Sequence, residues 1–360
     1  MTALYRGRSR HLLIGPLRSG RHMPDLATVV ILNWNGQDLI RDCLRSVLHQ
    51  TYPRYRVLVV DNGSTDGSQD VVAQEFPEVA LVRLPKNLHF ARGTNAGIRE
   101  ALKDHECAHI LTLNNDTKVD PDWLAELVRV SAGTGMVASK LLLMDRPRML
   151  NSTGLTIAPD GSGLDRGWNQ VDEGQYDASD DVFGPTAGAA LYRRELIEQI
   201  GLFDEEFVAY YEDVDLAWRA RLEGWEARYT PRAVVYHKFS ASHRRGSSLK
   251  TYLCERNRIW NLVQNYPWRY AVLTVPWNSA RVLAGPVPWN GARQSEAGRI
   301  RNPFAETANA TAHARIDAYA GMGRALAKRR ERAATRRVSP STVGDWLRRY
   351  HVSFRDAVLA

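Results

Sequence analysis

Hydrophobic residues follow two alternating patterns through the first third of the chain. Apolar runs rich in Val and Ile, which are typical of strands buried on both faces of a sheet, predict strands over 27–34, 55–61, 79–84 and 108–113. The intervening residues 37–50, 68–76 and 91–103 are predicted helices, the first with apolar side chains at clear helical spacing. This order predicts an α/β fold, with a mainly parallel sheet and helices on both of its faces.

Polar residues gather where these predicted strands end. Asn33 and Asn35 follow the first strand, Asp61 and Asn62 end the second, and Asn114, Asn115 and Asp116 end the fourth. A buried polar side chain costs free energy unless a partner compensates it. In open α/β sheets, ligands bind at the carboxyl ends of the strands, so we expect these residues to line one crevice. Each cluster taken alone is equally compatible with a turn or a helix cap.

Several common site types are excluded by missing motifs. No G-x-G-x-x-G pattern follows the first strand, and the chain has no G-x-x-x-x-G-K-[ST] loop. The cysteines Cys43, Cys107 and Cys254 are scattered without a C-x-x-C pair, which argues against a disulfide framework and against a zinc site.

Asp116 is the strongest candidate for a metal ligand. Mg²⁺ and Mn²⁺ prefer oxygen ligands and are commonly shared with substrate phosphates. Asp116 is alternatively a cap of the helix predicted over 121–130, but Asp120 directly precedes Pro121 and is expected to be the better cap. His237, at the end of a predicted strand, is a candidate second ligand or an ordinary core or surface histidine.

A second acidic cluster lies in "GLFDEEFVAYYEDVDLAWRARLEGW" (201–225), where Glu212 and Asp213 begin a predicted helix. Acidic residues are favoured at a helix N-terminus by the helix dipole, which gives a structural explanation. A carboxylate at the mouth of a pocket is also a candidate general base. Because adjacent residues do not share a helix face, we expect only one of the two to face the chemistry.

Positive charge is concentrated at the two ends of the chain. Residues 291–360 hold fourteen Arg or Lys and six Asp or Glu, and residues 1–22 hold five Arg and no acid. No continuous apolar region follows the basic start, so we expect a disordered arm over 1–24 rather than a signal peptide.

Two segments near the C-terminus are each open to two interpretations. Residues 268–290 are apolar and aromatic but are interrupted by three prolines, and residues 312–337 are predicted to form a basic helix. The first is an interfacial membrane segment or core packing, and the second binds an anionic surface or is a solvated face. A nucleic-acid partner is not expected, because no recognition fold accompanies the basic residues.

Taken in order, the motifs resemble the inverting nucleotide-sugar glycosyltransferases of family 2, in their rhamnosyltransferase-like branch. The motifs are "VVILNWNG", "VVDNGSTDGS", "NLHFARGTNAG", "LNNDT", "GAALYRRE", "GLFDEEFVAYYEDVDLAWR" and His237, and they cover about residues 27–240. The stretch "YLCERNRIWNLVQNYP" (252–267) is similar to the segment that follows in that branch. The resemblance implies a Rossmann-like GT-A domain over 25–266. Residues 267–360 are then expected to form a mostly helical, basic, membrane-associating extension.

The resemblance also implies a role for each candidate residue. Asp61 would contact the nucleobase, and the other implied donor-site residues are Asn33, Asn35, Asn62, Asn87, Arg92, Asn95, Asn114, Asn115, Gly188 and Ala189. Asp116 and His237 would ligate a divalent cation, Mg²⁺ or Mn²⁺. Asp213, paired with Glu212, would be the general base that deprotonates the acceptor hydroxyl.

Two positions depart from the family pattern. Asn114 stands where the metal motif usually begins with Asp, although Asn is usual in this branch, and this leaves metal dependence open. His89 stands where the pattern usually has glycine, which either narrows the donor pocket or reflects a relaxed turn.

The implied reaction transfers a sugar from a nucleoside-diphosphate sugar to a glycan or polyprenyl-linked acceptor in cell-envelope polysaccharide synthesis. Rhamnose is the first expectation for the sugar, and a UDP-hexose or UDP-galactofuranose donor is the second. The expected location is cytoplasmic and peripheral, at the inner face of the plasma membrane. The alternatives are a noncatalytic sugar- or membrane-binding module and a nucleotidyltransferase. The latter needs basic residues in the first loop, and "NWNGQD" has none.

Overall fold

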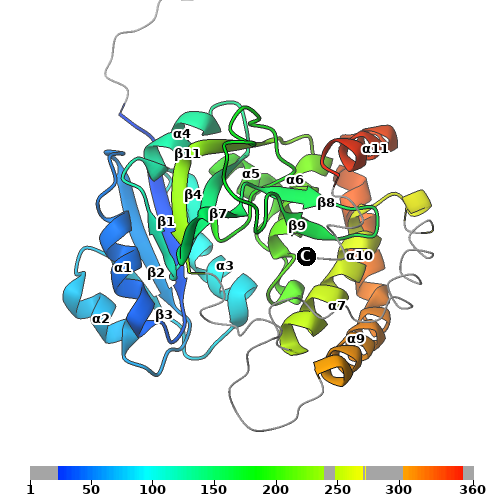
Figure 1. The fold of residues 1–360 in the computed structure, drawn as a ribbon, viewed down its shortest axis with the longest axis horizontal. Helices are drawn as coiled ribbons and strands as arrows, with labels where there is room; N and C mark the ends of the chain where they lie inside the picture. Colours follow the sequence, from blue (N-terminus) through cyan, green and yellow to red (C-terminus); the bar gives the residue numbers. More distant parts are fainter. Residues whose placement is uncertain (1–22, 239–247, 271, 273–302, 352–360) are drawn as a thin grey trace, which may run out of the picture.

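The computed structural model describes residues 23–238, 248–270, 272 and 303–351, which are built around one nine-stranded sheet (Figure 1). The strand order is β3–β2–β1–β4–β10–β6–β11–β5, with β7 paired to β6. The sheet strands are β1 Leu26–Asn33, β2 Tyr55–Asp61, β3 Ala80–Arg83, β4 Cys107–Asn114, β5 Thr117–Val119, β6 Met136–Leu143, β7 Arg146–Ser152, β10 Ala189–Arg193 and β11 Ala227–His237. A separate hairpin is formed by β8 (Leu155–Ile157) and β9 (Gly163–Asp165).

The helices are interspersed between these strands and then dominate the C-terminal part. They are α1 Gln37–Val47, α2 Ser68–Glu75, α3 His89–Leu102, α4 Trp123–Ser131, α5 Arg194–Ile200, α6 Glu212–Leu222, α7 Ser248–Asn265, α9 Pro303–Ala320, α10 Met322–Thr335 and α11 Pro340–Arg349. The predicted alternation of strands and helices through residue 114 is confirmed, with element ends differing by a few residues.

The first four strands are mutually parallel, as predicted, and their carboxyl ends meet at one edge. Asn33 pairs in register with Asp61, and Leu32 pairs with Asn114. Strand β10 then runs antiparallel between β4 and β6, which makes the sheet mixed but mostly parallel. The polar strand ends noted in the sequence therefore lie side by side.

Helices cover both faces of the sheet, because successive side chains of a strand point to opposite faces. Val29 and Ile31 of β1 belong to a core cluster with residues of α1, α2 and α4. Val30 between them belongs to a second cluster with residues of α3, α5 and α6. The apolar runs of β1, β2 and β4 were therefore correctly interpreted as buried strands, whereas β3, at the edge of the sheet, is only partly buried.

Two local predictions are wrong. The helix predicted over 312–337 is two helices, α9 and α10, which meet at Gly321. There the chain approaches α7 so closely that a Cβ on Gly321 would lie 2.6 Å from the Trp260 ring. Asp120 does not cap α4, because the helix begins later, at Trp123, with Asp122 at the N-cap position. Asp116 also lies well outside this helix and is not its cap.

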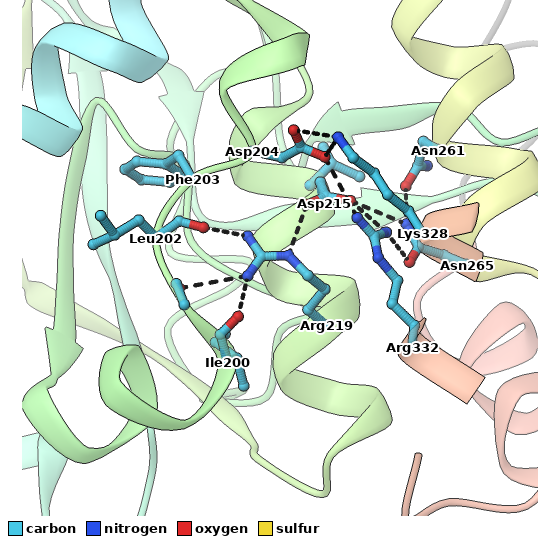
Figure 2. Close-up of polar contacts among 12 residues, drawn as sticks. Ile200, Leu202, Phe203, Asp204, Asp215, Arg219, Asn261, Asn265, Lys328 and Arg332 are labelled. Atoms are coloured by element: carbon cyan, nitrogen blue, oxygen red, sulfur yellow. Dashed lines mark hydrogen bonds and ion pairs between the residues drawn. The ribbon is translucent and has the colours of Figure 1, made fainter. Parts of the chain in front are cut away.

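Helix α10 is bound to α6 and α7 by buried polar contacts (Figure 2). Arg332 donates to Asp215 Oδ1 at 2.7 Å and to Asn265 Oδ1 at 2.6 Å. Lys328 Nζ lies 2.6 Å from Asp204 Oδ2, and Arg219 donates to Asp215 Oδ2 at 2.8 Å. These contacts use much of the positive charge of α10 within the protein rather than on its surface.

Arg332→Ala is expected to lower the free energy of unfolding by about 3 to 5 kcal/mol, because it leaves the fully buried Asp215 short of one cation. Burial opposes ionisation of Asp215, but Arg332 and Arg219 outweigh it and hold its pKa below the ordinary value. A lowered pKa stabilises the fold above the unfolded-state pKa, about 4, and this contribution is lost as pH falls through the folded-state value.

Urea unfolding of wild type and Arg332→Ala at neutral pH and near pH 3 tests this. The difference between the two proteins should shrink at the lower pH. Arg330→Ala, on the exposed side of the same helix, is the control and should change stability by less than about 0.5 kcal/mol. Equal losses in the two variants would contradict the assignment.

None of the helices described is long and apolar enough to cross a membrane. Residues 1–22 of the expected basic arm and residues 273–290 of the apolar segment lie outside the described residues. Trp268, at the start of that segment, is 55% exposed, and the guanidinium of Arg329 stacks 4.2 Å from its ring centroid.

Candidate active site

Asp116 and His237 are brought together by the antiparallel pairing of β5 with β11. His237 lies opposite Thr117 in the register, and the Lys238 amide donates to the Asp116 carbonyl at 2.9 Å. As a result, Asp116 Oδ1 and His237 Nε2 lie 3.1 Å apart. The Asn114 side-chain amide lies 3.4 Å from the same imidazole nitrogen.

The other nitrogen of His237 is fixed by Asn151, which the sequence analysis did not single out. His237 Nδ1 lies 2.6 Å from Asn151 Oδ1. An amide oxygen only accepts hydrogen bonds, so Nδ1 carries a proton, and Nε2 is the ring nitrogen that faces Asp116. This is the tautomer that a metal-ligating histidine needs, and such a second partner is typical of metal sites.

The spacing of these two ligand atoms suits a divalent cation. Two neighbouring ligands of an octahedral ion, each at about 2.1 Å, lie about 3.0 Å apart. Within the described residues there is no group of three or more His, Cys, Asp or Glu able to hold a metal. A cation at Asp116 and His237 would thus take its remaining ligands from a substrate or from water.

Asp213 reaches the same region through the segment just before β10. Its Oδ2 accepts from the Ala187 amide at 3.1 Å and its Oδ1 from the Val214 amide at 2.8 Å. The backbone carbonyl of the next residue, Gly188, accepts from the backbone amide of Asn114 at 2.9 Å. A Cβ on Gly188 would lie 3.3 Å from the Asn114 side chain, so a larger residue would crowd this contact. Ala189, fully buried, pairs with Leu113.

The two adjacent acids of α6 differ in environment. Burial raises the pKa of Asp213 above its ordinary value, although the amides of Ala187 and Val214 oppose the rise. Burial, and then the charge of Asp213, raise the pKa of Glu212 well above its ordinary value. Glu212 Oε2 is buried without a hydrogen-bond partner among the described residues. Glu212 therefore holds its proton more strongly than an ordinary glutamate.

The strand-end residues of β1, β2 and β4 form one buried network. Asn33 Nδ2 donates to Ser68 at 2.8 Å and to Asp61 at 3.3 Å. Asn33 Oδ1 accepts from Asn115 at 2.8 Å, which joins β1 to the end of β4. A Cβ on Gly36 would lie 2.2 Å from the Asn115 side chain, so glycine is required at that position.

Asp61 and Asn35 both order the loop that follows β2. Asp61 Oδ2 accepts from the Ser64 amide at 3.1 Å, and Asn35 Oδ1 accepts from the Thr65 amide at 2.8 Å. Asn35 has a positive φ of 46°, which Asn tolerates better than most residues. The two loops are thereby held against each other at the end of the sheet.

A cleft of about 380 Å³ opens beside this network. It is lined by Lys86, Asn87, Leu88, His89, Arg92, Glu205, Glu206 and Val208. Asn62 supports its wall, because its side chain donates to Asn87 Oδ1 at 3.0 Å and accepts from the Leu88 amide at 2.8 Å. His89 lines the cleft with a φ of 64°, a conformation that glycine adopts without strain, so both interpretations of this position have support.

Arg92 and Asn95, which the resemblance implies as donor-site residues, both bond other groups of the protein. Arg92 Nε pairs with Glu205 at 3.1 Å, although its side chain is 60% exposed. Asn95 is fully buried. Its Nδ2 donates to the Phe203 carbonyl at 2.8 Å, and its Oδ1 accepts from the Phe203 backbone amide at 3.1 Å. Asn95 thus ties α3 to the loop before α6.

A further acid, Asp165 on β9, lies near this site and was missed in the sequence. Burial raises its pKa to about 6, and the charge of Asp213 adds to the rise. Its Oδ1 is buried without a hydrogen-bond partner in the part of the chain described. No local sequence signal marks Asp165, because the β8–β9 hairpin that carries it is placed by contacts distant in sequence.

Comparison with solved structures first gives the type of fold. A solved structure of GalNAc-T7 with UDP, GalNAc and Mn²⁺ aligns with a TM-score of 0.55 at 13% identity, covering 82% of this chain and 57% of that one. The mostly parallel sheet with its sites at the strand ends is thus the GT-A type. Residues 28–201 match the model of Glycosyl transferase family 2, and this part of the chain belongs to that family. Glu212, Asp213 and His237 lie beyond the matched residues.

Two relatives are similar at modest identity. The O-antigen biosynthesis protein RfbC of Myxococcus xanthus is 30% identical over 217 residues, which is 58% of this chain but only 17% of the relative. The N-acetylglucosaminyl-diphospho-decaprenol L-rhamnosyltransferase of Mycobacterium tuberculosis is 28% identical over 274 residues, 66% of this chain and 87% of the relative. Both agree with the rhamnosyltransferase-like branch of the family.

Proposed function

We propose that this chain is an inverting glycosyltransferase of cell-envelope polysaccharide synthesis, which moves a sugar from a nucleoside-diphosphate sugar to a glycan or lipid-linked acceptor. The observation that carries the proposal is the convergence of two groups on residues 187–188. Asp213 binds the Ala187 amide, and Asn114, beside Asp116 and His237, binds the Gly188 carbonyl. A candidate base and a candidate cation site thus share one short segment.

In this proposal, the donor lies along the carboxyl ends of β1, β2 and β4. Asp61 and Asn33 are placed for the nucleoside, and the cleft beside Asn87 and Arg92 admits the rest of the donor. Asp116 and His237 would hold Mg²⁺ or Mn²⁺, which would supply positive charge beside the departing diphosphate. The fixed His237 tautomer and the 3.1 Å spacing are the observations that support this role.

Asp213 is the proposed general base. A base works best when its pKa lies close to the working pH, so the raised pKa of Asp213 favours the role. The amides of Ala187 and Val214 hold both carboxylate oxygens in place. Asp213 accepts the proton of the acceptor hydroxyl as that oxygen attacks the anomeric carbon, and the bond from this carbon to the diphosphate breaks on the opposite face. One displacement inverts the centre.

For the donor, we propose dTDP-rhamnose first and a UDP-hexose or UDP-galactofuranose second. The name of the Mycobacterium tuberculosis relative supports a rhamnose donor and a polyprenyl-linked acceptor. The name of the Myxococcus xanthus relative supports a role in envelope polysaccharide assembly.

Thermal unfolding with dTDP, UDP and GDP, each with and without Mn²⁺, tests the donor site. A nucleotide present at ~100-fold over its Kd should add about 2.7 kcal/mol to the stability of the native state. We expect one nucleotide to raise the melting temperature, and to raise it further with Mn²⁺. The corresponding sugar nucleotide should then release its diphosphate on incubation with envelope glycolipids. No shift with any nucleotide would contradict the proposed function.

A further inference from the structure

A strained turn connects the candidate donor cleft to the candidate base. In the segment from Phe207 to Tyr211, which we call the 207–211 turn, Val208, Tyr210 and Tyr211 have φ values of 69°, 65° and 70°. A positive φ is strained for any non-glycine residue, and a β-branched residue such as Val208 tolerates it least. Such a conformation persists only where the surrounding structure holds it.

The two ends of this turn carry parts of the site. At one end, the Val208 carbonyl accepts from the Ala91 amide at 3.0 Å. Val208 also lines the cleft, together with His89 and Arg92. At the other end, Tyr211 is the N-cap residue of α6, so the backbone of the turn leads directly into Glu212 and Asp213. The conformation of the turn therefore determines where Asp213 lies relative to the cleft.

Helix α7 holds the turn with one buried amide. Asn257 is fully buried, and its Nδ2 donates to three carbonyls of the turn, those of Phe207 at 2.9 Å, Ala209 at 3.0 Å and Tyr210 at 2.7 Å. Phe207 and Ala209 flank Val208, and Tyr210 is itself one of the positive-φ residues. Asn257 thus bonds the turn along most of its length.

The orientation of this amide is fixed by its neighbour. Arg256 donates to Asn257 Oδ1 from Nε at 3.0 Å and from Nη2 at 2.9 Å. A guanidinium has no acceptor, so the atom facing it must be the amide oxygen, and the NH₂ group must face the turn. Arg256 Nη2 also reaches the carbonyls of Glu206 and Phe207, at 3.0 and 3.2 Å.

We propose that Asn257, oriented by Arg256, is a positioning residue that holds the 207–211 turn in its positive-φ conformation and thereby places Asp213 against the donor cleft. Arg256 and Asn257 lie in "ERNR" of the stretch 252–267. The proposal gives these two residues a role, because neither the proposed donor site nor the proposed base uses them. The effect on catalysis rests on the proposed function, whereas the effect on the turn does not.

Asn261 provides a matched control on the same helix. It is also a fully buried asparagine, but its Nδ2 donates to the Gly161 carbonyl at 3.0 Å, in the β8–β9 turn. Asn257→Ala and Asn261→Ala therefore each remove one buried amide from α7, and only the first touches the 207–211 turn.

Amide hydrogen exchange of the native protein is the decisive measurement. In Asn257→Ala, exchange of residues 203–216 should become at least about tenfold faster, because local opening loses its restraint, with little change elsewhere. Asn261→Ala should leave exchange of residues 207–211 within that segment unchanged, although Asn261 also accepts from Asn265, a neighbour of Asp215. Unchanged exchange of 203–216 in Asn257→Ala, or an equal increase in Asn261→Ala, would overturn the proposal.

Val208→Gly gives a second, independent test. Glycine adopts a positive φ without steric cost, so Val208→Gly should offset part of the increase in exchange caused by Asn257→Ala. The double variant of Asn257→Ala and Val208→Gly is also useful if Asn257→Ala alone does not fold. Relief of the strain at residue 208 is then expected to let the double variant fold. A double variant that behaves no better than Asn257→Ala would count against a restraint on strain.

A measurement of turnover tests whether the 207–211 turn positions Asp213. With the sugar nucleotide selected by the nucleotide screen, Asn257→Ala should lower kcat at least about tenfold, while the Mn²⁺-dependent nucleotide shift stays near that of wild type. A normal kcat together with faster exchange would overturn the link to Asp213. Absence of turnover in wild type would instead refute the proposed function, and hydrogen exchange would still decide whether Asn257 holds the turn.

Discussion

Asp213→Asn is expected to lower sugar transfer by about 10² to 10⁴-fold, the range over which a positioned general base contributes. The amide retains the shape of the carboxyl, but its one oxygen accepts from only one of the Ala187 and Val214 amides, and its NH₂ group faces the other. Its nitrogen cannot accept the acceptor proton. The measurement is kcat with the selected sugar nucleotide, together with the nucleotide shift, which should remain close to wild type, and the melting temperature, which reports the loss of that one hydrogen bond.

Two comparisons sharpen this result. Glu212→Gln should lose less activity than Asp213→Asn, because burial and the charge of Asp213 favour the protonated form of Glu212, which glutamine resembles. In wild type, kcat should fall on acidification through a pKa above the ordinary aspartate value, since only ionised Asp213 accepts a proton. Equal losses in the two variants, or a kcat independent of pH down to pH 4, would remove Asp213 from the role.

Asp116→Ala is expected to abolish the Mn²⁺-dependent part of the nucleotide shift, up to about 2.7 kcal/mol at ~100-fold excess of nucleotide over Kd. The variant removes one of the two proposed protein ligands, and His237 alone would hold Mn²⁺ weakly. The metal-independent part of the shift should remain, because Asp61 and Asn33 are untouched.

Asn114→Asp is the opposite change at the same site. It adds a carboxylate beside His237 Nε2, so a lower Mn²⁺ concentration should suffice for half of the shift. A full Mn²⁺-dependent shift in Asp116→Ala would place the cation elsewhere and would also remove the explanation for the His237 tautomer.

The sheet and its polar edge were predictable because their signals are local. The apolar runs fix β1, β2 and β4, and parallel strands necessarily bring Asn33, Asp61 and Asn114 to one edge. The proximity of Asp116 and His237 was suggested by residue type and the family resemblance, and the β5–β11 pairing supplies the 3.1 Å contact.

The residues that complete the site were not predictable in this way. Asn151 and Asp165 approach His237 and Asp213 from β7 and β9, elements with short and weakly patterned sequences. The break between α9 and α10 was missed because the requirement for glycine at position 321 arises from the Trp260 ring, far away in the sequence. Each of these depends on a contact between distant segments, which periodicity does not report.

The attachment of α10 has a practical consequence for anyone who trims or recombines this enzyme. A shortened chain ending near residue 266 would retain Asp204 and Asp215 but lose Lys328 and Arg332, the cations that neutralise them. Asp215, which lies two residues from Asp213, would therefore have fewer cationic partners in such a chain. A chimera that takes any one of α6, α7 and α10 from a relative should accordingly take all three together.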